Sequence, residues 1–370
     1  MENGGGMFRK LWKLSLLLLT AVGAFLIYKF AFLIPDVTES VYAQTIYPFF
    51  TQIIGNLTKL VSFSVGELLL YIFAAYLIFG VVFTFFSFFK PKGRKLYHFC
   101  KRILTLAIVI CMVYSSFILN WGINYARKPL ADTMGLEIQE ATVAELKDTA
   151  IKLADKANSL RQQVSEDANG VFALTHSKEI VLESVQNVYD ACAPEYMNLG
   201  VKTRVKGVLT PNLLSTFRTT GIFSPFTYEA NVNMQMPELY FPAVAAHEYA
   251  HLKGFAREDE ASFVAWYVCS KSEDTDFAYS AYAYALTYVI NALYDVSPAD
   301  HQEVVSLLDE GILRDFANEN EYWQDFESDL ADTGEQIYDS YLQNNGVSDG
   351  RKSYGRMIDL IIALNREGEL

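Results

Sequence analysis

The sequence predicts a mainly helical protein with a small β element, in which three transmembrane helices precede an acidic α+β domain. Three long apolar runs lie within residues 1–122. Beyond them, apolar residues recur mostly at the three- and four-residue spacing of amphipathic helices, and one short segment alternates polar with apolar residues. The net charge changes at the same place. We therefore predict a membrane domain at 1–122 and a second domain at 123–370.

The charge asymmetry limits what the second domain can bind. Residues 1–122 hold eleven Lys/Arg and four Asp/Glu, a net charge of +7. The remaining residues hold 19 basic and 39 acidic side chains, a net charge of −20. An acidic surface repels phosphates, so we expect no nucleic acid among its partners.

The three apolar runs have the length of membrane spans, at about 14–34, 65–89 and 103–120. Runs of this length cross the roughly 30 Å of hydrocarbon in a bilayer. The first run is long for a cleaved signal peptide and lacks a convincing small-residue cleavage site. We therefore expect a multi-pass protein that has the lipid bilayer as a partner.

The basic residues predict the orientation of the spans. They precede the first span and crowd the loop between the second and third, whereas the loop between the first and second has only Lys59. Basic loops stay in the cytoplasm. This places the N-terminus inside a bacterial plasma membrane and the second domain outside it, although Arg127 and Lys128 weaken the assignment. The residues used are Arg9, Lys10, Lys13, Lys90, Lys92, Arg94, Lys95, Lys101 and Arg102.

Capping residues mark the first helices of the second domain. Thr142 and Glu145 form a capping box for a helix over about 142–164. Ser177 is placed to cap another helix that ends near Gly200. Cys192 and Cys269 are the two cysteines of this domain, and their spacing leaves open whether they pair.

The middle of the domain predicts a loop, a strand and a helix. Residues 219–227 contain glycine and proline, which predicts a loop. In residues 229–234, polar and apolar side chains alternate, which predicts a half-buried strand. A helix follows over 243–252, and Gly254 is placed to end it with a positive φ. Further helical patterns cover 274–294, 297–313, 318–341 and 353–364, with a turn at 344–346.

The predicted helix over 243–252 contains the sequence His247-Glu248-Tyr249-Ala250-His251, which has the pattern H-E-x-x-H. Positions i and i+4 share one helix face, so both imidazoles can bind one Zn²⁺. Glu248 can reach a water activated by the metal and act as its general base. The pattern is typical of zinc metallopeptidases.

A catalytic zinc needs a third protein ligand. The pattern H-E-x-x-H-x-x-G-x-x-H would place a histidine at position 257, but the residue there is Arg257, which cannot bind zinc. A helix that ends at Gly254 and a second one that begins near Glu258 would return a carboxylate to the histidines. We favour Glu258 as the ligand and keep Glu260 as the alternative. The carboxylate that does not bind is expected to hold a histidine N–H.

The same residues carry a family resemblance. Glu258-Asp259-Glu260-Ala261-Ser262 resembles the segment that holds the zinc-binding glutamate of gluzincins. Together with 226–233, 247–261 and 353–360, it makes nearly the whole chain resemble a bacterial membrane family catalogued as domain of unknown function 3810. The resemblance implies a zincin-like metallopeptidase domain after the membrane spans. Ser262 stands where we expect Asn in the family.

The residues therefore predict a membrane-anchored zinc metallopeptidase acting on a protein or peptide. Tyr354 is the expected donor to the oxyanion, with Arg356 and Tyr228 as alternatives. The strand that contains Asn231 and Asn233 is expected to hold an extended substrate by strand addition. Exported proteins, peptides and cell-wall peptide stems are the substrate classes considered. The alternatives are a non-catalytic zinc domain that senses or scaffolds, and an accidental motif.

Overall fold

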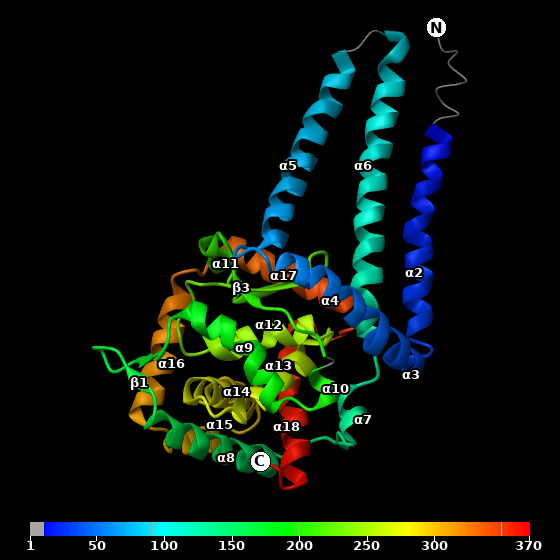
Figure 1. Ribbon diagram of the computed structural model, residues 1–370. Helices are drawn as coiled ribbons and strands as arrows, with labels where there is room; N and C mark the ends of the chain where they lie inside the picture. Colours follow the sequence, from blue (N-terminus) through cyan, green and yellow to red (C-terminus); the bar gives the residue numbers. More distant parts are fainter. Residues whose placement is uncertain (1–10, 90–91, 199, 349) are drawn as a thin grey trace.

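The computed structural model describes residues 11–89, 92–198, 200–348 and 350–370. Arg9, Lys10 and Lys90, which the orientation argument uses, lie outside these residues. Figure 1 shows the long helices α2, α5 and α6 projecting from one side of a helical domain. The mainly helical class with a small β element is confirmed.

Three helices are long and apolar enough to cross a membrane. These candidate spans cover Leu11–Ala31, Val65–Phe89 and Lys95–Asn120 within the described residues. They correspond to α2 (Leu19–Ala31) with the turns before it, α5 (Val65–Phe86) with the turn after it, and α6 (Lys92–Asn120). The three predicted spans are thus present as helices, with boundaries shifted by up to eight residues.

A short helical layer connects the first two spans. It contains α3 (Pro35–Val37), a π-helical stretch at Thr38–Ile46 and α4 (Tyr47–Thr58). The α4 side chains alternate in burial at helical spacing: Tyr47, Thr51 and Gly55 are buried against the domain, and the opposite face is apolar and exposed. Gly55 lies so close to Thr203 that a Cβ would be 2.5 Å from its Cγ2.

The second domain is a layered helical body around a small sheet (Figure 1). The capping box of Thr142 and Glu145 at α8 is confirmed by hydrogen bonds in both directions. The helices are α7 (Leu130–Met134), α8 (Val143–Arg161), α9 (Lys178–Cys192), α10 (Glu195–Asn198), α11 (Pro211–Thr216), α12 (Phe241–Leu252), α13 (Glu258–Ser270), α14 (Thr275–Val296), α15 (Pro298–Val305), α16 (Glu310–Gln324), α17 (Asp329–Asn344) and α18 (Met357–Arg366).

Several helices are more divided than the sequence pattern indicated. Pro194 interrupts the helix expected to run to Gly200, because a proline disfavours helical geometry at the residue before it, here Ala193. Asp309 caps a new helix, α16, within the segment expected to stay helical from 297 to 313. The final helix begins at Met357, after a 3₁₀ turn over Gly350–Arg356.

Within the described residues, five short strands form two sheets. A hairpin pairs β1 (Ser165–Glu166) with β2 (Phe172–Ala173). The other sheet has the order β3-β5-β4, and β3 (Val205–Gly207) was not predicted. The central strand β5 (Glu229–Val232) pairs parallel with β3 and antiparallel with β4 (Gly221–Ser224). The prediction of a loop over 219–227 is wrong at β4, where pairing with β5 makes four residues extended.

The main core surrounds α12. Every residue from Phe241 to Leu252 is buried, and α12 packs against α13, α14, α9 and β5. A second buried cluster contains residues from the spans, such as Tyr28 and Ile118, together with Tyr228, Ala256 and Leu342 of the following domain. The two predicted domains therefore share apolar packing across the boundary at residue 122.

Candidate metal centre

Two consecutive helices bring the candidate ligands together. His247 and His251 lie one turn apart on α12, with ring centroids 4.6 Å apart. Gly254 then adopts φ 92°, which an L side chain rarely tolerates, and the chain reverses direction. The next helix, α13, begins at Glu258. The sequence prediction of a glycine-ended helix followed by a second helix at Glu258 is confirmed.

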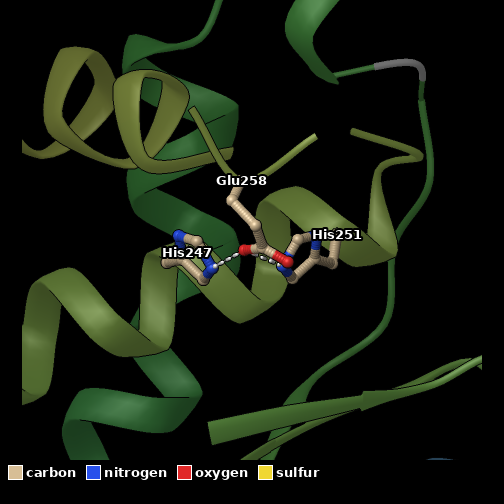
Figure 2. A group of neighbouring side chains, drawn as sticks. All are labelled: His247, His251 and Glu258. Atoms are coloured by element: carbon tan, nitrogen blue, oxygen red, sulfur yellow. Dashed lines mark ion pairs between the residues drawn. The ribbon is translucent and has the colours of Figure 1, made fainter. Parts of the chain in front are cut away.

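Three ligand atoms converge on one point. His247, His251 and Glu258 each offer one nitrogen or oxygen, and these atoms all lie within 4.8 Å of one another. The Glu258 Oε2 atom is 3.2 Å from the Nε2 atom of each histidine. Figure 2 shows the Glu258 carboxylate between the two imidazoles. All three side chains are buried, so the donor set is already assembled and screened from bulk water.

The other nitrogen of each imidazole has its own partner. His251 Nδ1 lies 2.7 Å from the Phe255 carbonyl oxygen, which can only accept, so Nδ1 carries the proton. His247 Nδ1 lies 3.1 Å from the Ser262 hydroxyl. These contacts orient both rings and leave Nε2 toward the centre. Ser262 therefore acts through a ligand, in the role expected for that position.

Glu260 does not take the place expected for it. Its Oε1 atom accepts hydrogen bonds from the backbone N–H of Leu130 and, at 2.8 Å, from Arg257. The expectation that Glu260 would hold a histidine N–H is wrong, because Ser262 and the Phe255 carbonyl occupy the two Nδ1 positions. Two residues along a helix turn the side chain by about 200°, which directs Glu258 and Glu260 to different faces.

Tyrosines from the C-terminal part of the chain close one side of the centre. The Tyr338 hydroxyl, on α17, donates to Glu258 Oε1 at 2.7 Å. The Tyr354 ring stacks on His247, with centroids 5.8 Å apart and planes at 18°. The hydroxyl groups of Tyr338 and Tyr354 lie 3.3 Å apart. Sequence reasoning singled out Tyr354 but missed Tyr338, which lies in a helical pattern without any local motif.

Arg356 and Tyr228, the alternative donors to the oxyanion, do not contact the candidate ligands in the way that Tyr354 does. The Arg356 guanidinium lies 3.5 Å from Asp259, and the Tyr228 hydroxyl donates to the Asn120 carbonyl at the end of α6. Tyr228 has a positive φ of 50° and packs against Tyr47. Tyr354 is thus the member of the three with a direct ring contact to a candidate ligand.

Burial and proximity perturb the protonation of the cluster. Burial would raise the pKa of Glu258, but the two histidines outweigh it and hold that pKa well below its usual range. Burial lowers the pKa of His247. Burial also opposes charge on His251, but Glu258 raises the pKa of His251 to about 9. The metal-free cluster therefore holds a proton on His251 against the Glu258 carboxylate.

Glu248 lies between the centre and the edge of the sheet. Burial raises its pKa to about 8. Among the described parts of the chain, its Oε2 atom has no hydrogen-bond partner. A Cβ added to Gly221 of β4 would be 2.5 Å from Glu248 Oε1, so only glycine allows this approach. The carboxylate is thus held close to an edge strand, with one oxygen available.

The two residues predicted to hold an extended substrate, Asn231 and Asn233, do not lie on an unpaired strand edge. Asn231 is in β5, whose two edges are paired with β3 and β4, and its amide donates to Ile222 and Glu229 carbonyls. The Asn233 amide donates to Ser215 and Thr219. Strand addition to β5 is therefore wrong for this fold. Within the sheet, β4 is the edge strand nearest Glu248.

The comparisons with known proteins identify the family. The model of a family described as "Protein of unknown function (DUF3810)" matches residues 42–362. The chain belongs to this family. No curated protein and no solved structure matches it. The family match spans α4 to α18 and includes the residues of the metal centre.

Proposed function

We propose that this DUF3810 protein is a membrane-anchored zinc metallopeptidase. The observation that carries the proposal is the convergence of His247, His251 and Glu258 within 4.8 Å, on the motif that also supplies Glu248. Buried groups of this kind are usually paired or bind a metal. An exposed acidic cluster would be weak support, but here all three ligands are buried.

The donor set fits zinc. Two imidazole nitrogens and one carboxylate oxygen are the ligands of a catalytic zinc site with one open position. Within the described residues Glu258 Oε2 accepts no hydrogen bond, and the two imidazole nitrogens 3.2 Å away are its partners, so one cation can be shared by all three atoms. A bound zinc would supply a Lewis acid and an activated water.

The side chains around the centre support hydrolysis of a peptide bond. Glu248 would accept a proton from the attacking water and return it to the leaving nitrogen. Ser262 and the Phe255 carbonyl hold the imidazoles, and Tyr338 holds Glu258. An extended substrate would pair with β4, which lies beside Glu248, and Tyr354 would donate to the carbonyl oxygen.

The orientation of the membrane part belongs to the same proposal. Basic residues precede the first span and crowd the loop between the second and third, and the positive-inside rule places such segments in the cytoplasm. The metal centre would then act outside a bacterial plasma membrane. The sequence left open whether Cys192 and Cys269 pair. They form no disulfide with each other, and both thiols are free.

Two substitutions test the proposal on the purified full-length protein. His251→Ala is expected to lose the one equivalent of zinc measured by metal analysis, and unchanged zinc would contradict the site. Glu248→Gln is expected to keep zinc and to lower hydrolysis of a quenched-fluorescence peptide library by about 100- to 10,000-fold. A zinc-loaded wild type that hydrolyses no peptide would instead support the sensing or scaffolding alternative.

A further inference from the structure

The candidate metal centre lies directly against the membrane end of the domain. The candidate span Lys95–Asn120 ends one residue before Trp121. The Trp121 ring lies 5.8 Å from the His251 ring and 4.5 Å from the Phe223 ring of β4, measured between centroids. One side chain therefore separates the end of a membrane span from a metal ligand.

The amphipathic helix α4 gives a second measure of this proximity. On its buried side, the Tyr47 hydroxyl donates to the carbonyls of His251 at 3.3 Å and Leu252 at 3.1 Å. Its other side is apolar and 45–64% exposed, which is the pattern of a helix lying in the membrane interface. The exposed side chains are Phe49, Phe50, Ile53 and Leu57.

The edge strand β4 leads from the centre to a membrane span. Gly221 at its start lies against Glu248, and a Cβ on Gly66 in the first turn of α5 would be 2.6 Å from Oγ of Ser224 at its end. Three residue steps of extended chain cover roughly 10 Å. A peptide paired along β4 would therefore pass from the catalytic carboxylate to the start of a span within a few residues.

The surface beside the start of α5 is also apolar. Glu67 in the first turn of α5 accepts hydrogen bonds from the backbone N–H groups of Leu209 and Thr210. The Leu209 and Leu213 side chains at this level are 54% and 44% exposed. Because the fixed contact places them at the depth where α5 enters the bilayer, they can face lipid without cost.

The spans diverge toward the domain. Contacts between α5 and α6 include Gly80 against Leu106 and Arg102 over Phe83, in the halves of these helices remote from the domain. In Figure 1 the two ribbons separate as they approach the domain. If α5 and α6 both cross the bilayer, another anchored chain can approach the candidate metal centre between them.

We propose that the substrates are polypeptides anchored in the same membrane and cut close to their anchor. The proposal rests on the peptidase function proposed above and specifies its substrate class. A lipid chain and a transmembrane helix are equivalent anchors in this respect, because each brings an extended peptide out of the bilayer at the level of β4. The cut is expected roughly three to eight residues from the membrane surface, the length of extended chain that spans about 10–25 Å.

The test uses full-length protein in liposomes of phosphatidylcholine and phosphatidylglycerol. A quenched-fluorescence library with ten randomised residues is presented in four forms: free, on a dipalmitoyl anchor with a short linker, on the same anchor with a thirty-residue Gly/Ser spacer, and on an apolar transmembrane helix. The spacer form controls for concentration at the membrane, because it has the same surface density. Glu248→Gln liposomes give the background rate.

We expect both short-linked forms to be cleaved at least tenfold faster than the spacer form and the free form. Cleavage of one short-linked form alone would assign the anchor as lipid or helix and still support the proposal. Equal rates for the short-linked and spacer forms, or equal rates for the free and anchored forms, would overturn it while leaving the peptidase function intact. Absence of cleavage in all four forms, with zinc bound, would overturn the peptidase function and this proposal with it.

Discussion

A single proton on His251 would have to leave before the proposed zinc could bind. In the metal-free protein, burial opposes charge on this imidazole, yet Glu258 at 3.2 Å raises its pKa to about 9. Zinc binds only the neutral ring, so at neutral pH the metal must displace that proton. The ion pair between His251 and Glu258 would therefore make zinc binding depend on pH.

We expect the apparent zinc affinity to fall about tenfold for each unit of decreasing pH between 8 and 6. The direction follows because a group with a raised pKa is protonated throughout this range, and each unit of falling pH makes proton displacement tenfold harder. Competition with a chromophoric chelator measures the affinity. An affinity that does not change over this range would show that His251 is neutral in the metal-free protein.

The residues of the candidate centre that lie close together in the sequence were predictable. The residue that the fold brings to it from a distant segment was not. His247, Glu248, His251 and Glu258 lie within twelve positions, so helix periodicity and one glycine are enough to gather them. Tyr338 reaches Glu258 from 80 positions away, through packing of α17 that no local pattern encodes. The choice of Glu258 over Glu260 depended on which helix face turns toward α12.

At the scale of elements, β4 shows where sequence patterns fail. Its four residues begin with Gly221 and are followed at once by Pro225, so the local signal indicated a loop. The extended form comes from pairing with β5, in the register Gly221↔Val232 to Ser224↔Glu229. The neighbouring helix α12 was predictable because its motif and its proline lie within it and Gly254 follows two residues after its end.

Gly221→Ala tests whether β4 positions Glu248. A Cβ at this position would be 2.5 Å from Glu248 Oε1, so either the strand or the carboxylate must move. We expect zinc content to stay at one equivalent and peptide hydrolysis to fall about 100-fold, the effect of a displacement near 1 Å in an active site. Metal analysis and a peptide library assay measure the two quantities.

Gly23→Ala is the matched control, because a Cβ there meets nothing within 4 Å. It is expected to leave both zinc content and hydrolysis unchanged. Full hydrolysis by Gly221→Ala would mean that the edge strand does not fix the catalytic carboxylate.

At the scale of the whole molecule, buried polar contacts connect the second domain rigidly to its membrane helices. The Glu229 carboxylate, in β5, accepts hydrogen bonds from the backbone N–H groups of Val65 and Gly66 at the start of α5. It also pairs with Lys206 of β3 at 2.5 Å, and both side chains are only 1% exposed. The Glu229 carboxylate therefore accepts hydrogen bonds from the N-terminus of α5 and also neutralises the buried Lys206 ammonium.

Glu229→Gln removes the negative charge of this side chain and keeps its approximate shape. The buried Lys206 ammonium would lose its counter-ion, which costs about 3–5 kcal/mol when one partner of a buried pair is removed. We expect thermal unfolding of the detergent-solubilised protein to shift to clearly lower temperature. Glu183→Gln, at an exposed position of α9, is the control, and its unfolding should change by less than about 0.5 kcal/mol. Equal unfolding temperatures for the two variants would mean that the Glu229–Lys206 pair does not contribute to stability, and that the remaining contacts, such as the packing of Tyr47 against Trp121, hold the domain to its spans.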